Sequence, residues 1–308
     1  MYISSISVLM AVNRSGNISE YHLNRNQPDK AQFVIYDMGQ YLKKNAANTT
    51  RPHIHSYYQV IWFKSGTGKH FVDFKEYDVF ENAIFFIAKN QVHYFDANTD
   101  YTGVLIHFNE TFLVHNDSEM DFLLKFELFN NPYQQPSCCI GSDIEHLLDG
   151  YLRQIMAELK NQDAFGKEEL LRIYLKAFLI QVQRRRYELQ QNNGQFRRVQ
   201  DERRSQLMKF VNLVNENYMK GMAVSEYARL MHISSRTLSD LTSQLLNKTP
   251  SQMIMEHIIL EAQRLLLHSN LNVNQIGYRL GFDDPSYFVK YFKKHTTISP
   301  MDFRKSIA

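Results

Sequence analysis

Cysteine is almost absent from this sequence, and the two that occur are badly placed for a structural bond. Of the 308 residues, only Cys138 and Cys139 are cysteines, and they are adjacent. Neighbouring cysteines have poor geometry for a mutual disulfide and no third cysteine is available, which is typical of the reducing cytoplasm. The pair also lacks the spacing of a zinc site. We interpret both residues as small apolar side chains buried in the core.

Long apolar runs and a secretion signal are also missing. No stretch approaches the ~18 consecutive apolar residues that a membrane helix needs. The N-terminal sequence MYISSISVLMAV has neither a basic start nor a small-residue cleavage site, so we do not expect a signal peptide. The sequence predicts a soluble cytoplasmic protein without a membrane partner.

Charge is nearly balanced over the whole chain, but its distribution is uneven. The net charge is +3, which alone excludes little. Residues 196–308 contain 16 Lys and Arg against 10 Asp and Glu, a net charge of +6, so the remainder is mildly acidic. A basic C-terminal region behind an acidic N-terminal one favours a polyanionic partner at the C-terminal end.

Short β-type segments fill the region from about Phe33 to Phe112. They are rich in β-branched and aromatic residues and are separated by turn signals such as the SGTG of residues 65–68. The clearest segments are Tyr57–Phe63, Gly68–Phe74, Ala83–Ala88 and Gly103–Phe108. Short, regularly spaced strands of this kind predict a small β-barrel or sandwich.

The hydrophobic period changes to that of a helix after Ile144. One apolar face carries Leu148, Leu152, Ile155 and Leu159, and a second carries Leu171, Tyr174, Leu175, Phe178 and Val182. These faces predict two helices, separated by the NQDAFG of residues 161–166. The helical hairpin from Ile144 to Val182 can pack on the barrel or form a homodimer, and we expect both. The polar stretch 183–204 that follows is typical of a helix end and a linker.

Residues 206–308 contain an internal duplication. Pro250 is matched by Pro300, a spacing of 50. At the same spacing Leu238 pairs with Phe288, Leu241 with Tyr291 and Met253 with Phe303. Upstream the spacing is 49, for Val224 with Val273, Tyr227 with Ile276, Ala228 with Gly277 and Ile233 with Phe282. The second copy therefore has one extra residue in its turn.

Each copy begins with a short helix. The pattern predicts these helices at Val224–Met231 and at Val273–Leu280. A small residue, Ala228 in one and Gly277 in the other, occupies the place where two helices must approach closely. A tight turn follows in both copies, which is the layout of a helix-turn-helix unit.

The second helix of each copy has its own start signal. Ser234 in the first copy and Asp283 or Asp284 in the second are capping residues, and Pro285 suits a first helical turn. Between the copies, Ser251–Ser269 is predicted to be one long helix that joins the two units. A helical bundle without a DNA role is the alternative, and the basic charge and the polar positions on both second helices argue against it.

The segment from Ile276 to Arg304, IGYRLGFDDPSYFVKYFKKHTTISPMDFR, resembles the signature of the arabinose-operon regulator (AraC/XylS) family. The resemblance covers residues 206–308. It implies a seven-helix DNA-binding domain whose two recognition helices enter successive major grooves. Most members activate transcription, often through contacts with RNA polymerase, so the resemblance implies double-stranded DNA and RNA polymerase as partners.

Carried over position by position, the resemblance also implies eight DNA-contacting residues. They are Ser235, Arg236, Ser239 and Asp240 in the first recognition helix and Pro285, Ser286, Val289 and Lys290 in the second. Arg236 can read guanine bidentately, and Lys290 can bind guanine or phosphate. Two positions depart from the family. Asp240 stands where a basic residue is common, and Thr242 replaces a usual aromatic residue, which predicts a less tightly packed first unit.

The stretch from Arg51 to Phe95 resembles the cupin-like sensor domain of the same family, over about residues 30–115. In catalytic cupins a His-x-His pair, a carboxylate and a later histidine hold a metal. Here the histidines match, but Tyr58 and Gln59 fill the carboxylate position. Three imidazoles could still bind zinc or iron, or they hydrogen-bond across the barrel or line a ligand pocket. We predict no resident metal or cofactor. The candidate ligand-binding residues are His53, His55, Trp62, His70, His93 and His107.

The sequence as a whole favours a DNA-binding transcription regulator, an activator controlled by a small molecule, and not an enzyme. A metal-dependent cupin enzyme with an accessory DNA-binding domain is the main alternative, and the missing carboxylate argues against it. A ligand-independent structural DNA binder is the other. The predicted domains are a cupin-like sensing domain at 1–140, the helical hairpin at 141–192, a linker at 193–205 and a double helix-turn-helix domain at 206–308.

Overall fold

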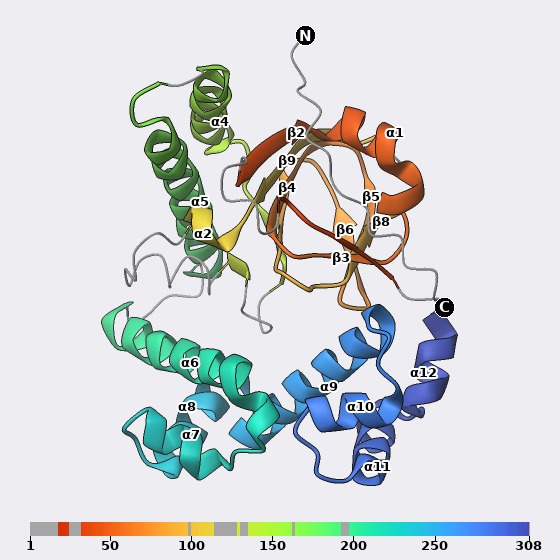
Figure 1. Cartoon of the computed structure of the whole chain (residues 1–308). Coiled ribbons are helices and arrows are strands. Elements are labelled where there is room, and N and C mark those ends of the chain that lie inside the picture. The colour runs from red at the N-terminus through yellow and green to blue at the C-terminus, as the bar shows by residue number, and fades with distance from the viewer. Residues whose placement is uncertain are drawn as a thin grey trace. The chain divides into compact units, whose positions relative to one another are not determined.

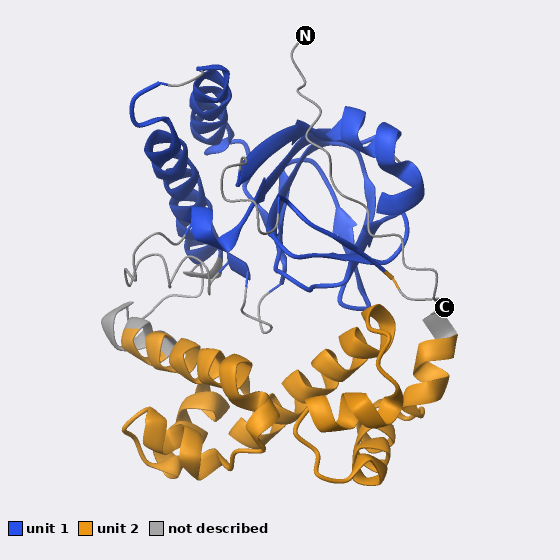
Figure 2. Ribbon diagram, in the orientation of Figure 1, with its two compact units in different colours: residues 1–12, 19–194 blue, residues 13–18, 195–308 orange. Residues whose placement is uncertain are grey.

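A computed structural model describes residues 18–24, 32–97, 100–113, 128–129, 135–161, 164–191 and 197–307 of the chain. The chain divides into two compact units, residues 1–12 with 19–194 and residues 13–18 with 195–308 (Figure 2). The first unit is β-rich and includes the helical hairpin, and the second is helical. This confirms the predicted fold class, while the finer domain boundaries stay predictions.

The β-strands described in the first unit form two five-stranded sheets. One sheet has the order β1 (Ser19–Tyr21), β3 (His53–His55), β8 (His93–Phe95), β5 (Gly68–Val72) and β6 (Lys75–Val79). The other has the order β10 (Ser137–Cys139), β7 (Ala83–Ile87), β4 (Tyr58–Ser65), β9 (Thr102–Phe108) and β2 (Phe33–Asp37). The four clearest predicted segments are all strands, and β1 and β10 lie outside the region from about Phe33 to Phe112 in which strands were predicted.

Both faces of the second sheet are covered, which explains the continuous apolar run in β4. Ile61 and Phe63 point into the core between the sheets, whereas Val60 and Trp62 belong to a second core on the other face. Successive residues of a strand alternate between faces, so a strand covered on both sides reads as apolar throughout.

Two further helices follow strands of the first unit. Helix α1 (Met38–Thr49) is capped by Asp37, whose carboxylate accepts the Gln40 backbone N–H at 2.9 Å. Its residue Leu42 is buried in the core between the sheets. Helix α2 (Glu110–Leu113) is a single turn after β9.

A pair of helices covers the outer face of the second sheet. Helix α4 spans Glu145–Lys160 and helix α5 spans Lys167–Gln191, and they pack side by side (Figure 1). Their predicted apolar faces, apart from the half-buried Leu159 and Tyr174, are buried in the same cluster as Trp62. The prediction that the hairpin packs on the barrel is therefore confirmed.

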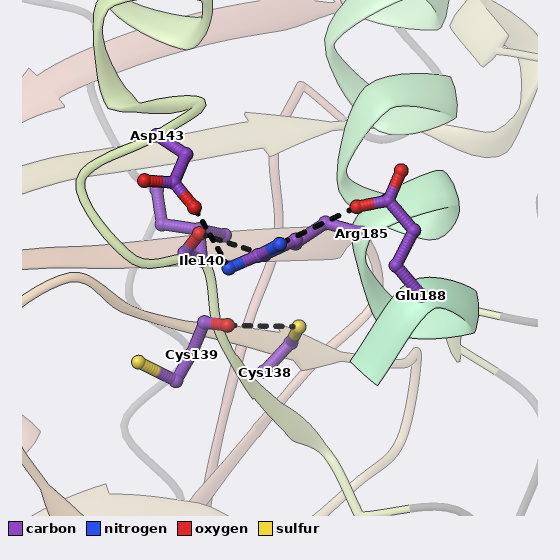
Figure 3. Close-up of polar contacts among 6 residues, drawn as sticks. All are labelled: Cys138, Cys139, Ile140, Asp143, Arg185 and Glu188. Atoms are coloured by element: carbon purple, nitrogen blue, oxygen red, sulfur yellow. Dashed lines mark hydrogen bonds and ion pairs between the residues drawn. The ribbon is translucent and has the colours of Figure 1, made fainter. Parts of the chain in front are cut away.

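Strand β10 lies at an edge of the second sheet, and an arginine of α5 ties the residue that follows it to the helix (Figure 3). The Arg185 Nε donates to the Ile140 carbonyl oxygen at 3.1 Å. The same guanidinium contacts the carboxylates of Asp143 at 3.3 Å and Glu188 at 3.4 Å. These contacts fix where the chain leaves the sheet and enters α4.

The two cysteines of β10 lie in different environments. Cys138 is buried, and burial raises the pKa of its thiol to about 11. Cys139 is exposed. The prediction that both are buried is wrong for Cys139, because neighbouring residues of a strand point to opposite faces and this edge strand is covered on one side only.

Seven α-helices and a short 3-10 helix make up the described part of the second unit. They are α6 (Arg197–Asn217), η2 (Tyr218–Lys220), α7 (Val224–Leu230), α8 (Ser235–Leu246), α9 (Pro250–His268), α10 (Val273–Arg279), α11 (Pro285–Thr296) and α12 (Pro300–Ile307). Residues 197–205 of the predicted linker thus belong to a helix. The polar residues there include the strong helix formers Arg, Gln and Glu, so their composition suits a helix as well as a linker.

Helix α9 packs against both halves of the second unit. It contacts α6 and α8 on one side and α10, α11 and α12 on the other. In the second half Phe288, Phe292 and Phe303 pack with Leu266 of α9. This confirms the predicted joining helix, and it gives the two helix-turn-helix units a shared support.

Within the described residues, no helix is both long enough and apolar enough to cross a membrane.

Candidate nucleic-acid interface and barrel site

The second helices of the two repeats, α8 and α11, begin and end alike. The Ser234 hydroxyl and the Asp284 carboxylate each accept a first-turn backbone N–H, at 3.0 Å and 2.8 Å. Both helices end at a residue with left-handed backbone, Asn247 in one and Thr297 in the other. The predicted caps are therefore confirmed, with Asp284 rather than Asp283 in that role.

The turns that precede these helices differ by one residue, as the repeat predicts. Four residues (231–234) separate α7 from α8, and five (280–284) separate α10 from α11. The equivalent positions His232 and Gly281 both have positive φ, 55° and 85°. An ideal Cβ placed at Gly281 would lie only 2.0 Å from the Met219 carbonyl oxygen, so any side chain here would clash. His232 instead holds a left-handed conformation that non-glycine residues adopt at a cost.

Close helix approach explains the small residue in each repeat. An ideal Cβ at Gly277 would lie only 3.2 Å from Cβ of Phe288. Ala228 occupies the equivalent place and is buried. The predicted reason is confirmed for Gly277, and the burial of Ala228 agrees with it.

The eight predicted DNA-contacting residues lie along the solvent side of α8 and α11. Ser235, Arg236, Asp240, Ser286 and Lys290 are exposed, and Ser239, Pro285 and Val289 are half-buried. The opposite face of each helix is core, with Leu238 and Thr242 in α8 and Phe288 in α11 fully buried. The Thr242 hydroxyl donates to the Ser239 carbonyl oxygen at 3.2 Å, so a polar side chain fills a position that an aromatic residue would pack.

The two recognition helices differ in charge. In α8, the positive charge of Arg236 and the negative charge of Asp240 lie one turn apart and cancel. In α11, Lys290 is followed by Lys293 and Lys294, which are exposed in the last turn. The DNA-contacting positions carried over from the family do not include these two lysines, although both are visible in the sequence KYFKKH.

A cluster of five buried histidines lies in the first unit. His53 and His55 come from β3, His70 from β5, His93 from β8 and His107 from β9. None is more than 3 % exposed. The structure thus brings together five of the six residues that the sequence proposed as ligand-binding, and we call them the barrel histidines.

The barrel histidines contact one another through ring nitrogens. His93 Nδ1 lies 3.3 Å from His70 Nε2, and His93 Nε2 lies 3.2 Å from His55 Nδ1. His53 Nδ1 donates to the Arg51 carbonyl oxygen at 2.8 Å. Neutral imidazole has one donor and one acceptor nitrogen, so a single chain of hydrogen bonds can run from His70 through His93 to His55.

Burial keeps these imidazoles neutral. Loss of hydration lowers the pKa of His53 to about 4, and that of His70 and His107 to about 3. Burial, followed by the neighbouring histidines, also lowers the pKa of His55 and His93 well below the usual value. A charged form is disfavoured in a low-dielectric interior, so the barrel presents lone pairs at neutral pH.

Tyr57 and Gln59 complete this polar interior; the sequence placed Gln59 only at the carboxylate position of cupins, and it did not single out Tyr57. Tyr57 stacks on His55, with ring centroids 4.4 Å apart, and also on His107. Gln59 faces His107 across β4 and β9. Among the described residues, Gln59 Oε1, His70 Nδ1 and His107 Nε2 are buried without a hydrogen-bond partner. Strand alternation could have located Gln59 in the barrel interior. Residues 59, 61 and 63 lie on the same face of a strand, and the apolar Ile61 and Phe63 mark that face as buried.

Trp62, the sixth proposed ligand-binding residue, is not in this cluster. It points to the opposite face of β4, with its ring 5.9 Å from that of Phe178 in α5. Its Nε1 donates to Asn82 Oδ1 at 3.3 Å. Trp62 therefore packs between the sheet and the helical hairpin and stabilises their contact.

Three of the barrel histidines could hold a metal ion. His53, His55 and His93 each offer one ring nitrogen, and these atoms all lie within 4.8 Å of one another. Within the described part of the chain, no Cys, Asp or Glu joins this group.

Known protein families match both units of the chain. A helix-turn-helix domain matches residues 227–306, and an AraC-like ligand binding domain matches residues 41–174. The first covers both recognition helices, and the second covers the barrel histidines and α4.

Curated relatives are transcription regulators. The chain is 24% identical over 261 residues to the HTH-type transcriptional activator RhaS of Escherichia coli O139:H28, which covers 82% of this chain and 87% of the relative. It is 25% identical over 99 residues to an uncharacterized HTH-type transcriptional regulator, YdeC, of Bacillus subtilis. That match spans only 34% of the relative's length.

Among solved structures, the chain is similar to ToxT from Vibrio cholerae O395, with 15% identity, a TM-score of 0.43 and coverage of 91% of this chain and 99% of that one. Because an AraC-like ligand binding domain and a helix-turn-helix domain match successive parts of the chain, and the activator RhaS aligns with 82% of it, the chain belongs to the AraC-type family of DNA-binding transcription regulators.

Proposed function

We propose that this chain activates transcription as a homodimer that binds specific double-stranded DNA and responds to a small molecule held in its barrel. The observation that carries the proposal is the pair of recognition helices, α8 and α11, capped alike and exposed on one polar face. In helix-turn-helix proteins such a helix lies in the major groove, with its N-terminal residues at the base edges.

The two helices are proposed to read two short boxes about one helical turn, ~10 base pairs, apart. Arg236 is the direct reader in the first box, because its guanidinium fork matches the two acceptors of guanine. Lys290 binds guanine or phosphate in the second box. Asp240 repels phosphate and at best accepts from a cytosine amine.

The small-molecule part of the proposal rests on the polar interior of the barrel. Three buried polar atoms without partners, in Gln59, His70 and His107, leave hydrogen-bonding capacity that a ligand would satisfy. The proposed lining is the barrel histidines with Tyr57 and Gln59. Trp62 is left out because it faces the helical hairpin.

Activation is supported by the name of the RhaS relatives, which are transcriptional activators. We propose RNA polymerase as a partner and the cytoplasm as the compartment, since bacterial promoters are found there. A regulator without catalytic activity is proposed in preference to a metal-dependent enzyme, because the curated relatives above are regulators.

Mapping of bound sites across the host genome tests the proposal. The wild-type chain is expected to occupy a set of promoters, and the double variant Arg236→Ala with Lys290→Ala is expected to lose them. Arg153→Ala, which removes an exposed cation from α4, is the matched control and should bind like the wild type. Equal occupancy by the double variant would refute the assignment of the DNA-binding face.

The genes beside the occupied sites also suggest effectors to try. An effector that changes the DNA affinity of the purified chain supports the sensing role. If no compound drawn from those genes changes affinity or transcription, the chain is a ligand-independent DNA binder.

A further inference from the structure

The two halves of the second unit touch each other directly, in addition to their shared packing on α9. One half runs from α6 to α8 and the other from α10 to α12, and η2 lies in the first of them, between α6 and α7. The Met219 carbonyl oxygen of η2 lies against Gly281, in the turn between α10 and α11, since an ideal Cβ on that glycine would be 2.0 Å from the oxygen. The backbones of the two halves therefore meet, and we call this the η2 contact.

The ring of Tyr218 extends the η2 contact. It packs against the hydrophobic core of the second half, which contains Phe288 and Phe292 of α11. It also lies edge-on to His257 of α9, with the ring centroids 4.7 Å apart. Burial, followed by the charge of Glu261, raises the pKa of its hydroxyl to about 12, so the ring is neutral in this position. A residue of the first half is thus part of the packing of the second.

The η2 contact requires glycine for two reasons. Gly281 has a φ of 85°, a left-handed conformation that side chains rarely adopt. The Met219 carbonyl carbon would also be only 2.7 Å from an added Cβ. Because the obstructing atoms belong to the backbone, rotation of a side chain cannot relieve the clash. Alanine here must therefore move the turn away from η2, and α11, which begins four residues later at Pro285, moves with it.

The η2 contact bears on how α8 and α11 are held relative to each other. Two bodies that share only one helix can hinge about it, whereas a second point of contact restricts that motion. The η2 contact is such a point, because it joins the segment before α7 to the turn before α11. With this contact in place, the two recognition helices have one relative distance and one relative rotation.

We propose that Gly281 and Tyr218 are positioning residues, which fix the separation and phase of α8 and α11 and so set the spacing between the two DNA boxes. This inference rests on the proposed function, in which each recognition helix reads one box. Successive base pairs differ by about 3.4 Å along the duplex and by about 35° around it. A rigid pair of helices therefore suits one spacing, whereas a hinged pair suits several. Discrimination between spacings is then a property of the η2 contact.

Binding of the full-length chain to duplexes of altered spacing tests the proposal. The two boxes found by genome mapping are placed about 9 to 12 base pairs apart, centre to centre, in a series of otherwise identical duplexes. A duplex whose second box is replaced by unrelated sequence is the single-box reference. The wild type is expected to bind one spacing best and to lose affinity about tenfold or more when a base pair is added or removed.

Substitutions on both sides of the η2 contact should remove most of this discrimination. Gly281→Ala pushes the turn away from η2, and Tyr218→Ala removes the ring without placing anything between the backbones. Tyr218→Phe keeps the ring and should behave like the wild type. Gly221→Ala is the matched control, because Gly221 also has a positive φ, 62°, but a Cβ there would meet nothing within 4 Å. It should keep the wild-type optimum, and circular dichroism checks the fold of each variant.

The single-box reference separates altered positioning from loss of fold. A repositioned second half still contributes to binding, so each variant should bind its best two-box duplex more tightly than the reference. If Gly281→Ala does not, its second half is unfolded and Tyr218→Ala decides. An optimum as sharp as that of the wild type in either folded variant, or an equal loss of discrimination in Gly221→Ala, overturns the inference.

The wild type alone distinguishes failure of this inference from failure of the proposed function. Specific binding with equal affinity for all spacings would overturn the role of the η2 contact and leave the regulator standing. Absence of any sequence-specific binding would refute the proposed function itself.

Discussion

Equivalent positions of the two recognition helices carry different chemistry. Arg236 and Asp240 in α8 correspond to Ser286 and Lys290 in α11, and all four are exposed. Among the described residues, Arg236, Asp240 and Lys290 take no part in an ion pair, so each remains available to DNA. Base reading is therefore expected to depend on α8, and phosphate attraction on α11.

Substitution of these side chains should separate the two contributions. Arg236→Ala should cost about 1–3 kcal/mol of binding free energy and relax preference at one base position. Lys290→Ala should weaken binding and, if it meets phosphate, lower the slope of log affinity against log salt by about one. Asp240→Ala should leave affinity unchanged or raise it. Titrations on operator variants at several salt concentrations measure all three effects, with Arg153→Ala as the control.

The assignment fails if Arg236→Ala and Lys290→Ala both bind like the wild type, because the recognition helices would then have been misplaced.

His232 offers a gain in stability. Its positive φ of 55° is strained for a side chain, and the equivalent residue of the second repeat is Gly281. His232→Gly is therefore expected to raise the free energy of unfolding by about 0.5–1 kcal/mol. Denaturant unfolding measures the change. His232→Ala keeps the strain and should show no gain, and an equal gain in both variants would contradict the explanation.

His257 of α9 should make the second unit sensitive to acid. Burial lowers its pKa to about 4, and its ring packs edge-on against Tyr218. Because the folded pKa is below the unfolded value of about 6.5, its stabilising contribution is complete above pH ~6.5 and is lost as the pH falls toward 4. The loss amounts to at most about 3–4 kcal/mol, since the pKa falls from about 6.5 to about 4 and each pKa unit corresponds to about 1.36 kcal/mol.

Comparison of His257→Leu with the wild type isolates this group, since all other histidines are common to both proteins. Unfolding midpoints at pH 7 and pH 5 are measured for each. The variant should lose less stability than the wild type between these two values. An identical loss would mean that His257 does not contribute.

At the scale of elements, the helical hairpin has apolar side chains left on its surface. Leu170 and Ile173 lie on neighbouring turns of α5 and are 37% and 49% exposed. Phe165, in the loop before α5, is fully exposed. Residues three apart on a helix lie on the same side, so we expect Leu170 and Ile173, with Phe165 nearby in sequence, to pack against a second copy of the chain.

A charged substitution in this patch should prevent dimer formation. The wild-type chain is expected to be a dimer in light scattering at micromolar concentration, and Leu170→Glu with Ile173→Glu is expected to be a monomer. Phe80→Glu, an equally exposed apolar position between β6 and β7, serves as the control. A strictly monomeric wild type, with and without DNA, would rule out the dimer.

Local signals explain what the sequence could predict about these elements. Ser234, Pro250, Pro285 and Pro300 act through their own backbone and nearest neighbours, so the helices they begin could be located. The same holds for the apolar faces of α4 and α5, whose 3.6-residue period survives in a single sequence.

Contacts between distant strands explain what the sequence could not predict. Trp62 and Gln59 both occur in a strand whose first six residues are all buried, and only the pairing of β4 with β7 and β9 decides which of them faces the barrel histidines. Edge strand β10 has three residues and no pattern of its own. The helical start of α6 was obscured because a polar helix and a linker can have the same composition.

At the scale of the whole molecule, the second unit has its own core. Phe210 of α6 packs edge-on against Tyr227 of α7 at 5.8 Å, and α9 supports both halves. Residues 195–308 are therefore expected to fold and bind DNA alone. Circular dichroism and DNA titration of that fragment test this, and an unfolded fragment would show that the boundary is wrong. A fragment that begins at residue 223 lacks Phe210 and should be markedly less stable.

The unequal charge of α8 and α11 gives each bound domain a direction. Two identical recognition helices would bind a site almost equally well in either orientation, but we propose that here α8 discriminates bases and α11 mainly attracts phosphate. If the DNA site were reversed, the order of the two boxes along the duplex would be reversed. The bound domain would then turn around, and the lysine-rich α11 would lie at the opposite end of the site. The orientation of a site relative to the start of transcription, as well as its base sequence, then becomes information that the promoter encodes.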